Sequence, residues 1–196
     1  MSRLPDDVAH IGTCGGVEIG VAPHDAVTVD AALAIAGMFE RELGRERPAG
    51  GLDHLDRALG GAITRLRADG IFSGGLGAML TLSTPEPPVR AGSILVMGLG
   101  DPEQWRPDTM RTVLACAARE AVRLDVVSAG FAPGLLDSGL HPDRLAGVSD
   151  AMLAGLLDGL GDGRRGALTH WIFCTGATHL DATVAVFRQG FARLAR

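Results

Sequence analysis

The sequence has no lysine and no tyrosine, and all 18 of its basic residues are arginine. A coding sequence rich in G and C explains this bias, but the bias has a chemical consequence all the same. A chain without lysine has no Schiff-base lysine, no P-loop lysine and no lysine general base. Chemistry that needs any of these groups is therefore excluded.

Three further absences narrow the class of protein. The three cysteines, Cys14, Cys116 and Cys174, are far apart and odd in number, so we expect no disulfide framework and a reducing, cytoplasmic location. No apolar run approaches the roughly 20 residues that span a bilayer, and the N-terminus lacks a signal-peptide core, so no membrane partner is expected. The net charge of −5 shows no excess of basic residues, so no nucleic-acid partner is expected.

What remains is an ordinary globular composition of 196 residues, 46% of them hydrophobic. This length allows one domain with a substantial core. No linker, low-complexity tract or repeat divides the chain. We therefore expect a single domain over residues 1–196, with residues 1–16 as a flexible or peripheral segment.

Apolar runs and helical periodicities alternate along the chain. Strands are predicted at residues 17–21, 78–83, 93–98, 125–130 and 169–174. Helices are predicted at residues 31–43 (capped by Asp30), 52–67, 107–124, 143–160 and 181–196. Strands separated by helices imply a mostly parallel mixed sheet with helices on both faces, which is a three-layer α/β/α sandwich.

Three of the predicted strands end in glycine-rich loops, at residues 98–101, 130–134 and 175–179. The carboxyl ends of parallel strands lie along one edge of a sheet, so these loops could form one small-molecule crevice. Glycine lets backbone N–H groups approach an anion closely, although tight turns also need glycine. The candidate ligand-binding residues are Gly98, Gly100, Asp101, Gly130, Phe131, Gly134, Thr175 and Gly176.

The loop after the strand at 93–98 is expected to be first a strand-to-helix turn, with any ligand role secondary. Its strand is apolar on both faces, so Leu99 should be buried. Asp101 disfavours a bare phosphate beside it, and Pro102 has no N–H to donate. These features suit a ribose or a neutral polar group better than a pyrophosphate.

Motifs that would specify a nucleotide site, a catalytic serine or a metal site are incomplete in this sequence. Glu103 stands where a dinucleotide-binding G-x-G-x-x-G loop needs its third glycine, and Val126 stands where a G-x-S-x-G elbow around Ser128 needs glycine. His170 and Cys174 share a strand face and His179 follows, but no complete metal motif supports them. His54 and His141 are expected to be solvated. We therefore expect no catalytic residue, no metal and no cofactor.

Several motifs in order resemble the N-terminal domain of the M17 leucyl aminopeptidases. They are Leu55-Asp56, Gly60-Gly61, Phe72-Ser73-Gly74 and Val96-Met97-Gly98-Leu99-Gly100. The resemblance runs over about residues 17–196 and is best between 52 and 121. It implies a macro-domain-like α/β/α sandwich, in which the helix predicted at 31–43 would be an insertion.

In that family the chemistry lies in a separate C-terminal domain with two metal ions, carboxylates and a lysine, so the resemblance implies a stand-alone chain without catalytic residues. Two functions stay open. One is an interaction, assembly or regulatory module that forms a homo-oligomer or binds a protein partner. The other is binding of an ADP-ribose-like nucleotide at the glycine loops, although the aspartate that macro domains use against adenine has no clear counterpart at Ala22-Pro23-His24-Asp25.

Overall fold

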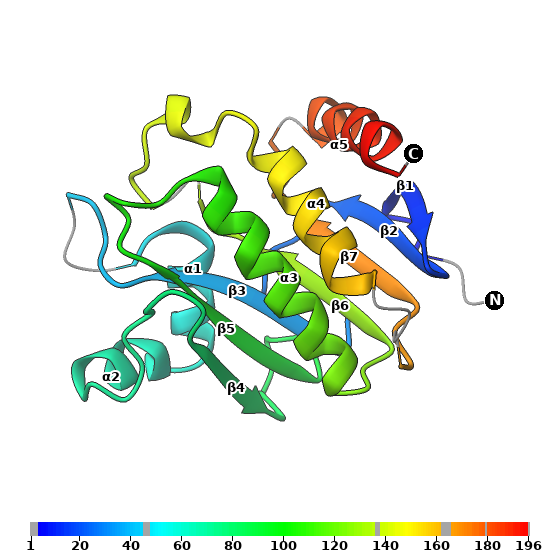
Figure 1. Ribbon diagram of the computed structural model, residues 1–196. Helices are drawn as coiled ribbons and strands as arrows, with labels where there is room; N and C mark the ends of the chain where they lie inside the picture. The colour runs from blue at the N-terminus through cyan, green and yellow to red at the C-terminus, as the bar shows by residue number, and fades with distance from the viewer. Residues whose placement is uncertain (1–3, 45–47, 136–137, 162–165, 179, 196) are drawn as a thin grey trace.

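A computed structural model describes residues 4–44, 48–135, 138–161, 166–178 and 180–195. Its centre is a seven-stranded sheet in the order β1-β2-β7-β6-β3-β5-β4 (Figure 1). The strands are β1 (Ala9–Cys14), β2 (Val17–Ala22), β3 (Leu33–Phe39), β4 (Met79–Ser83), β5 (Ser93–Gly100), β6 (Ser128–Ala132) and β7 (His170–Cys174).

The five inner strands, from β2 to β5, are parallel, and the two edge strands β1 and β4 pair antiparallel with their neighbours. This is the mostly parallel mixed sheet that the sequence predicts. The segment 1–16, expected at the periphery, contains β1 and so supplies one edge of the sheet. The carboxyl ends of the five parallel strands meet along a single edge.

Helices and loops cover both faces, which confirms the three-layer sandwich. The helices are α1 (Gly50–Ala58), α2 (Ala62–Ala68), α3 (Pro107–Arg123), α4 (Val148–Leu160) and α5 (Leu180–Leu194), with a 3-10 turn at Pro142–Leu145. In Figure 1, α3 and α4 lie in front of the sheet and α1 lies behind it. Alternate strand residues divide accordingly: Ile35 packs with the α3–α5 side, and Ala34 packs with Leu55 of α1.

The helix predicted at residues 31–43 is wrong, because β3 occupies that stretch at the centre of the sheet. All seven residues of β3 are buried, since strands flank it on both sides and layers cover both faces. A short, continuous apolar run does not distinguish a buried strand from a buried helix. Asp30 therefore caps no helix, and the stretch is not an inserted helix.

Other boundaries shift for local reasons. The single helix predicted at 52–67 is two helices, because Gly60 and Gly61 have φ angles of +62° and +82° between them. The helix predicted at 143–160 starts at Val148 after the 3-10 turn. The strand predicted at 125–130 is β6, two to three residues later, and β5 continues to Gly100 instead of turning at Gly98. In the described parts of the chain, no helix combines the length and the hydropathy that crossing a bilayer requires.

Candidate functional site at the carboxyl edge of the sheet

The predicted ligand-binding residues all lie at or near the carboxyl ends of β5, β6 and β7. The parallel pairing of β7 with β6, of β6 with β3 and of β3 with β5 brings these ends to one edge of the sheet. The topology therefore places the three glycine loops on the same side of the molecule. Whether a ligand can reach them depends on what each backbone group already contacts.

Gly98 and Gly100 have no N–H groups left for an anion. The Gly98 N–H donates to the carbonyl oxygen of Ala78 at 2.7 Å, and the Gly100 N–H donates to the carbonyl oxygen of Gly74 at 3.0 Å. A Cβ on Gly98 would lie 1.9 Å from the carbonyl oxygen of Gly75. Glycine is required at position 98 because another stretch of backbone lies against it.

The covering segment is residues 74–77, which we call the 74–77 cover. Its own glycine, Gly74, has a φ of +81°, and a Cβ there would lie 2.7 Å from the carbonyl oxygen of Phe39 at the end of β3. Leu76 lies over Gly100, with its Cβ 3.0 Å from the position that a Gly100 Cβ would take. Leu99 is 1% exposed, which confirms the prediction that it is buried.

The segment after β3 closes the same edge from the other side. The Arg67 guanidinium, from α2, donates to the Phe39 carbonyl oxygen at 2.7 Å and pairs with Glu42 at 3.4 Å. The Leu43 N–H donates to the Ser138 carbonyl oxygen at 3.4 Å. Residues 40–44 are thus held between α2 and the segment that follows β6.

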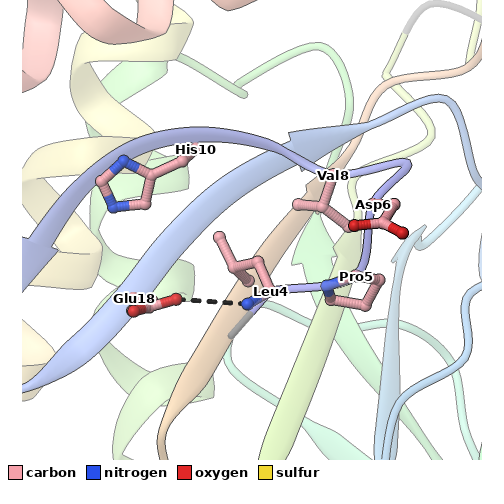
Figure 2. Close-up of a pocket in the computed structure, with 6 residues that line it drawn as sticks. All are labelled: Leu4, Pro5, Asp6, Val8, His10 and Glu18. Atoms are coloured by element: carbon pink, nitrogen blue, oxygen red, sulfur yellow. Dashed lines mark hydrogen bonds between the residues drawn. The ribbon is translucent and has the colours of Figure 1, made fainter. Parts of the chain in front are cut away.

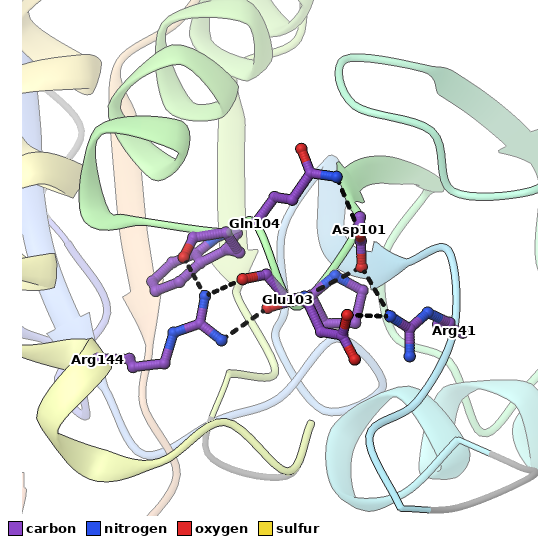
Figure 3. A network of polar contacts seen from close by, with 7 residues as sticks. Arg41, Asp101, Glu103, Gln104 and Arg144 are labelled. Atoms are coloured by element: carbon purple, nitrogen blue, oxygen red, sulfur yellow. Dashed lines mark hydrogen bonds and ion pairs between the residues drawn. The ribbon is translucent and has the colours of Figure 1, made fainter.

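The Asp101 carboxylate is hydrogen-bonded to neighbouring groups of the protein, so it is not left free for a ligand (Figure 3). Its carboxylate accepts hydrogen bonds from the Glu103 N–H at 3.0 Å, from the Gln104 side-chain amide at 3.1 Å and from Arg41 at 3.2 Å. Arg41 also pairs with Glu103 at 3.0 Å. The Glu103 N–H, followed by Gln104 and Arg41, outweighs burial and lowers the pKa of Asp101.

Arg144 fixes the turn between β5 and α3. Its guanidinium donates to the carbonyl oxygens of Pro102 at 2.9 Å and Glu103 at 3.0 Å, and also to that of Trp105 (Figure 3). A guanidinium has several donors in a fixed fork, so it can hold adjacent carbonyls in one arrangement. Sequence reasoning missed Arg41 and Arg144, because each acts on a turn at least 39 residues away.

Gly130 and Phe131 lie within the fold. A Cβ on Gly130 would lie 2.6 Å from Cγ2 of Val29, so the glycine makes room for that side chain. Phe131 is fully buried and stacks on Trp171 with ring centroids 6.4 Å apart. Neither residue presents a side chain or a free surface to the carboxyl edge.

Gly134, Thr175 and Gly176 are more open. Gly134 and Gly176 have φ angles of +64° and +69°, and a Cβ on Gly176 would meet nothing within 4 Å. The Thr175 N–H donates to the Ala22 carbonyl oxygen at 3.1 Å, and the Gly176 N–H donates to the His24 carbonyl oxygen at 3.3 Å. The Thr175 hydroxyl oxygen is buried and has no hydrogen-bond partner among the described residues.

An Asp–His pair that sequence analysis did not predict lies just after the end of β2. His54 Nδ1, on α1, lies 2.6 Å from Asp25 Oδ2. Asp25 Oδ1 accepts from the N–H groups of Val27 and Thr28. Burial disfavours the Asp25 carboxylate, but the hydrogen bonds from His54 and Thr28 outweigh it, so the pKa of Asp25 is lowered. The spacing of Asp25 and Thr28 was the available local signal, since it permits reciprocal side-chain bonds across a turn.

Ser128 and His141, which the sequence analysis considered as motif or solvated residues, contact other residues of the protein. Ser128 opens β6, and its hydroxyl accepts from the Ala32 N–H at 2.9 Å. His141 is exposed and pairs with Asp143 at 3.2 Å. His179 lies outside the described residues. Within the described ranges, no three His, Cys, Asp or Glu side chains gather as a metal site would require.

A separate hollow of about 420 Å³ lies at the β1–β2 edge, away from the glycine loops (Figure 2). Leu4, Pro5, Asp6, Val8, His10 and Glu18 line it. Glu18 is already engaged, since its carboxylate accepts from the Leu4 N–H at 3.2 Å and lies 4.0 Å from His170 Nε2. The Glu18 carboxylate in this hollow is therefore already bound within the protein.

Comparison with known proteins identifies the family of this chain and the solved structures that share its fold. The model of the cytosol aminopeptidase family, N-terminal domain, matches residues 35–160. The match begins inside β3, so this strand is part of the family's domain and not an insertion. No curated protein sequence matches the chain.

Solved structures share the fold at low sequence identity. A variant of tomato leucine aminopeptidase superposes with a TM-score of 0.63 at 20% identity, over 86% of this chain and 35% of that chain. The Trypanosoma brucei macrodomain in complex with ADP-ribose gives 0.66 at 17% identity, over 93% and 73%. The Oceanobacillus iheyensis macrodomain with ADP gives 0.62 at 14% identity, over 96% and 95%. The chain thus spans about a third of the tomato enzyme.

Proposed function

The chain belongs to the cytosol aminopeptidase family by its N-terminal domain, and on that premise we propose that it is a non-catalytic module that works by association with protein. The partner is a further copy of the chain or another protein. The observation that carries this proposal is the closed edge at β5, where the N–H groups of Gly98 and Gly100 both donate to backbone carbonyls. Glycines that pack backbone against backbone leave no anion nest at this position.

The charges at this edge support the same function. An anionic phosphate needs free donors or an unpaired cation. Here Arg41 is shared between Asp101 and Glu103, and Arg144 is bound to three backbone carbonyls. A phosphate would have to displace these internal contacts and would meet two carboxylates. The arrangement stabilises the turn into α3 rather than preparing a ligand site.

Apolar side chains are exposed beside the closed edge. Ile71, Leu76 and Met79 are 66%, 57% and 47% exposed, and they lie in one stretch of chain around the 74–77 cover and the start of β4. Exposed apolar groups that gather in one region are typical of protein-binding surfaces. This region is the surface that we assign to association.

Sedimentation equilibrium of the purified chain tests the proposal. We expect an average molar mass that rises above the monomer value as concentration increases from about 1 to about 100 μM. The matched variant is Leu76→Ser, which removes one exposed apolar side chain and should lower the mass at each concentration. A chain that stays monomeric and instead binds ADP-ribose would contradict the proposal.

A second candidate function is binding of an ADP-ribose-like nucleotide at the loops after β6 and β7. It is favoured by the open positions of Gly134 and Gly176 and by the buried, unpartnered hydroxyl of Thr175. Calorimetric titration with ADP-ribose tests it. If the Thr175 hydroxyl binds the ligand, Thr175→Val should weaken binding about tenfold. No heat at about millimolar nucleotide removes this candidate.

The cytoplasmic location stays a prediction, which rests on the free cysteines Cys14, Cys116 and Cys174. The lack of lysine within residues 1–196 supports a non-catalytic role for this domain. This chain covers about a third of the tomato leucine aminopeptidase, so the activity of that enzyme is not carried over to it.

A further inference from the structure

Strand β4 forms an open edge of the sheet. It is the last strand in the order, paired on one side with β5 and, in the described part of the chain, with nothing on the other (Figure 1). Its burial alternates, so Met79, Thr81 and Ser83 are exposed and Leu80 and Leu82 pack toward the side of α1. An edge strand of this kind presents unpaired backbone groups to another chain.

The ladder shows which backbone groups face outward. The Thr84 N–H donates to the Gly92 carbonyl oxygen at 3.2 Å, and the Gly98 N–H donates to the Ala78 carbonyl oxygen at 2.7 Å. Hydrogen-bonded pairs alternate along an antiparallel ladder, so the even-numbered residues of β4 bond to β5. The N–H and C=O groups of Met79, Thr81 and Ser83 therefore point away from the sheet.

No charged residue protects this edge. The sequence from residue 70 to residue 85 contains no Asp, Glu, Arg or Lys. Natural edge strands usually carry a charge or a proline that blocks pairing with another strand, and β4 has neither. Two copies of β4 would meet without repulsion between like charges.

We propose that two copies of the chain pair antiparallel along β4, about a two-fold axis beside Thr81, to form one continuous sheet. This inference rests on the proposed association function and names its partner as a second copy. The outward groups are self-complementary under the two-fold axis, because Thr81 then faces Thr81 of the second copy and Met79 faces Ser83. A second copy also places the exposed Thr81 beside its own counterpart, and Thr–Thr pairs across antiparallel strands contribute to stability.

Cysteine cross-linking tests the register directly. In the proposed dimer the two copies of residue 81 have Cα atoms about 5.5 Å apart, which is within the reach of a disulfide. Thr81→Cys should give a disulfide-linked dimer under mild oxidation. Ser83→Cys alone should not, because its two copies lie about 14 Å apart along the strands. A mixture of Ser83→Cys and Met79→Cys should cross-link again, and the wild-type chain serves as the control for its three native cysteines.

Association without cross-linking tests the surface itself. Thr81→Pro removes an outward N–H and leaves the bonds to β5 intact, and it should weaken self-association at least about tenfold. Thr81→Lys should do the same by placing two like charges together. The matched control is Thr112→Lys, on the exposed face of α3. Circular dichroism of each variant confirms the fold.

Two results would overturn the inference, and they differ in what they mean for the proposed function. If the chain self-associates but Thr81→Pro and Thr81→Lys leave that association unchanged, another surface is used and the association function stands. If the wild-type chain is monomeric at every concentration and Thr81→Cys does not cross-link, the β4 pairing and self-association both fail.

Discussion

The N–H of Gly100 donates to the carbonyl oxygen of Gly74 at 3.0 Å, so the end of β5 is hydrogen-bonded to a loop that precedes β4. A glycine-rich strand end that resembles the start of a nucleotide site is thereby closed by the chain itself. The glycines at this edge allow two stretches of backbone to approach each other. This contact occupies the backbone donors that an anion would need at the end of β5, and it supports the proposed association function there.

Gly98→Ala should destabilise the fold by about 3 kcal/mol, because overpacking against backbone cannot relax by a side-chain movement. The added Cβ would lie 1.9 Å from the carbonyl oxygen of Gly75. The matched control is Gly75→Ala, whose Cβ has its nearest neighbours at 3.8 Å and which should be neutral or slightly stabilising. Urea denaturation measures both, and equal midpoints would contradict the packing role.

Arg144→Met should cost about 2 kcal/mol, because it leaves three carbonyls of the turn before α3 without their charged donor. The amides of residues 101–106 should also exchange with solvent faster. Arg111→Met removes an exposed pair with Asp158 and should cost about 0 to 1 kcal/mol. A loss of stability at Arg144 no larger than at Arg111 would contradict the role of Arg144 in fixing this turn.

Asp25→Asn should destabilise the fold more at about pH 7 than at about pH 3. The pKa of Asp25 is lowered from 3.8, so its ionised form stabilises the fold above that value. This stabilisation is lost as the pH falls through the folded pKa. The control is Asp143→Asn, in the exposed pair with His141, for which the loss should be small at both pH values. A loss at Asp25 that does not shrink in acid would contradict the role of the Asp25 carboxylate.

The chain should not hydrolyse a leucyl-anilide in the presence of manganese or zinc. It contains no lysine, and no group of three metal-ligating side chains exists in the described ranges. A colorimetric assay of the purified chain against a metal-only blank measures this. Metal-dependent turnover that scales with protein concentration would overturn the non-catalytic role.

Much of the fold follows from the sequence where a local pattern dictates one structure. The apolar run at Ser93 is long and continuous because layers cover both faces of β5, and Pro107 marks the first turn of α3. The stretch from Leu33 was wrongly predicted to be a helix, because its small apolar residues also fit a helix. Only its neighbours β5 and β6 make it a strand, and a single stretch of sequence does not contain them.

The candidate site was less predictable, because its decisive contacts join distant segments. Glycine at 98 is readable from the sequence, but the backbone that lies against it comes from residues 74–78. Asp25 and His54 are 29 residues apart and meet only because α1 lies beside the end of β2. The sequence indicates which residues are special, and the topology determines whether they bind a ligand or each other.

An NMR titration with ADP-ribose, followed at individual backbone amides, tests the closed edge most directly. The amides of Gly98 and Gly100 should keep their chemical shifts at about millimolar nucleotide, because their N–H groups already bond to Ala78 and Gly74. Any response should be confined to Gly134, Thr175 and Gly176. Saturable shifts at Gly98 and Gly100 would contradict the account and make the loop after β5 a nucleotide site.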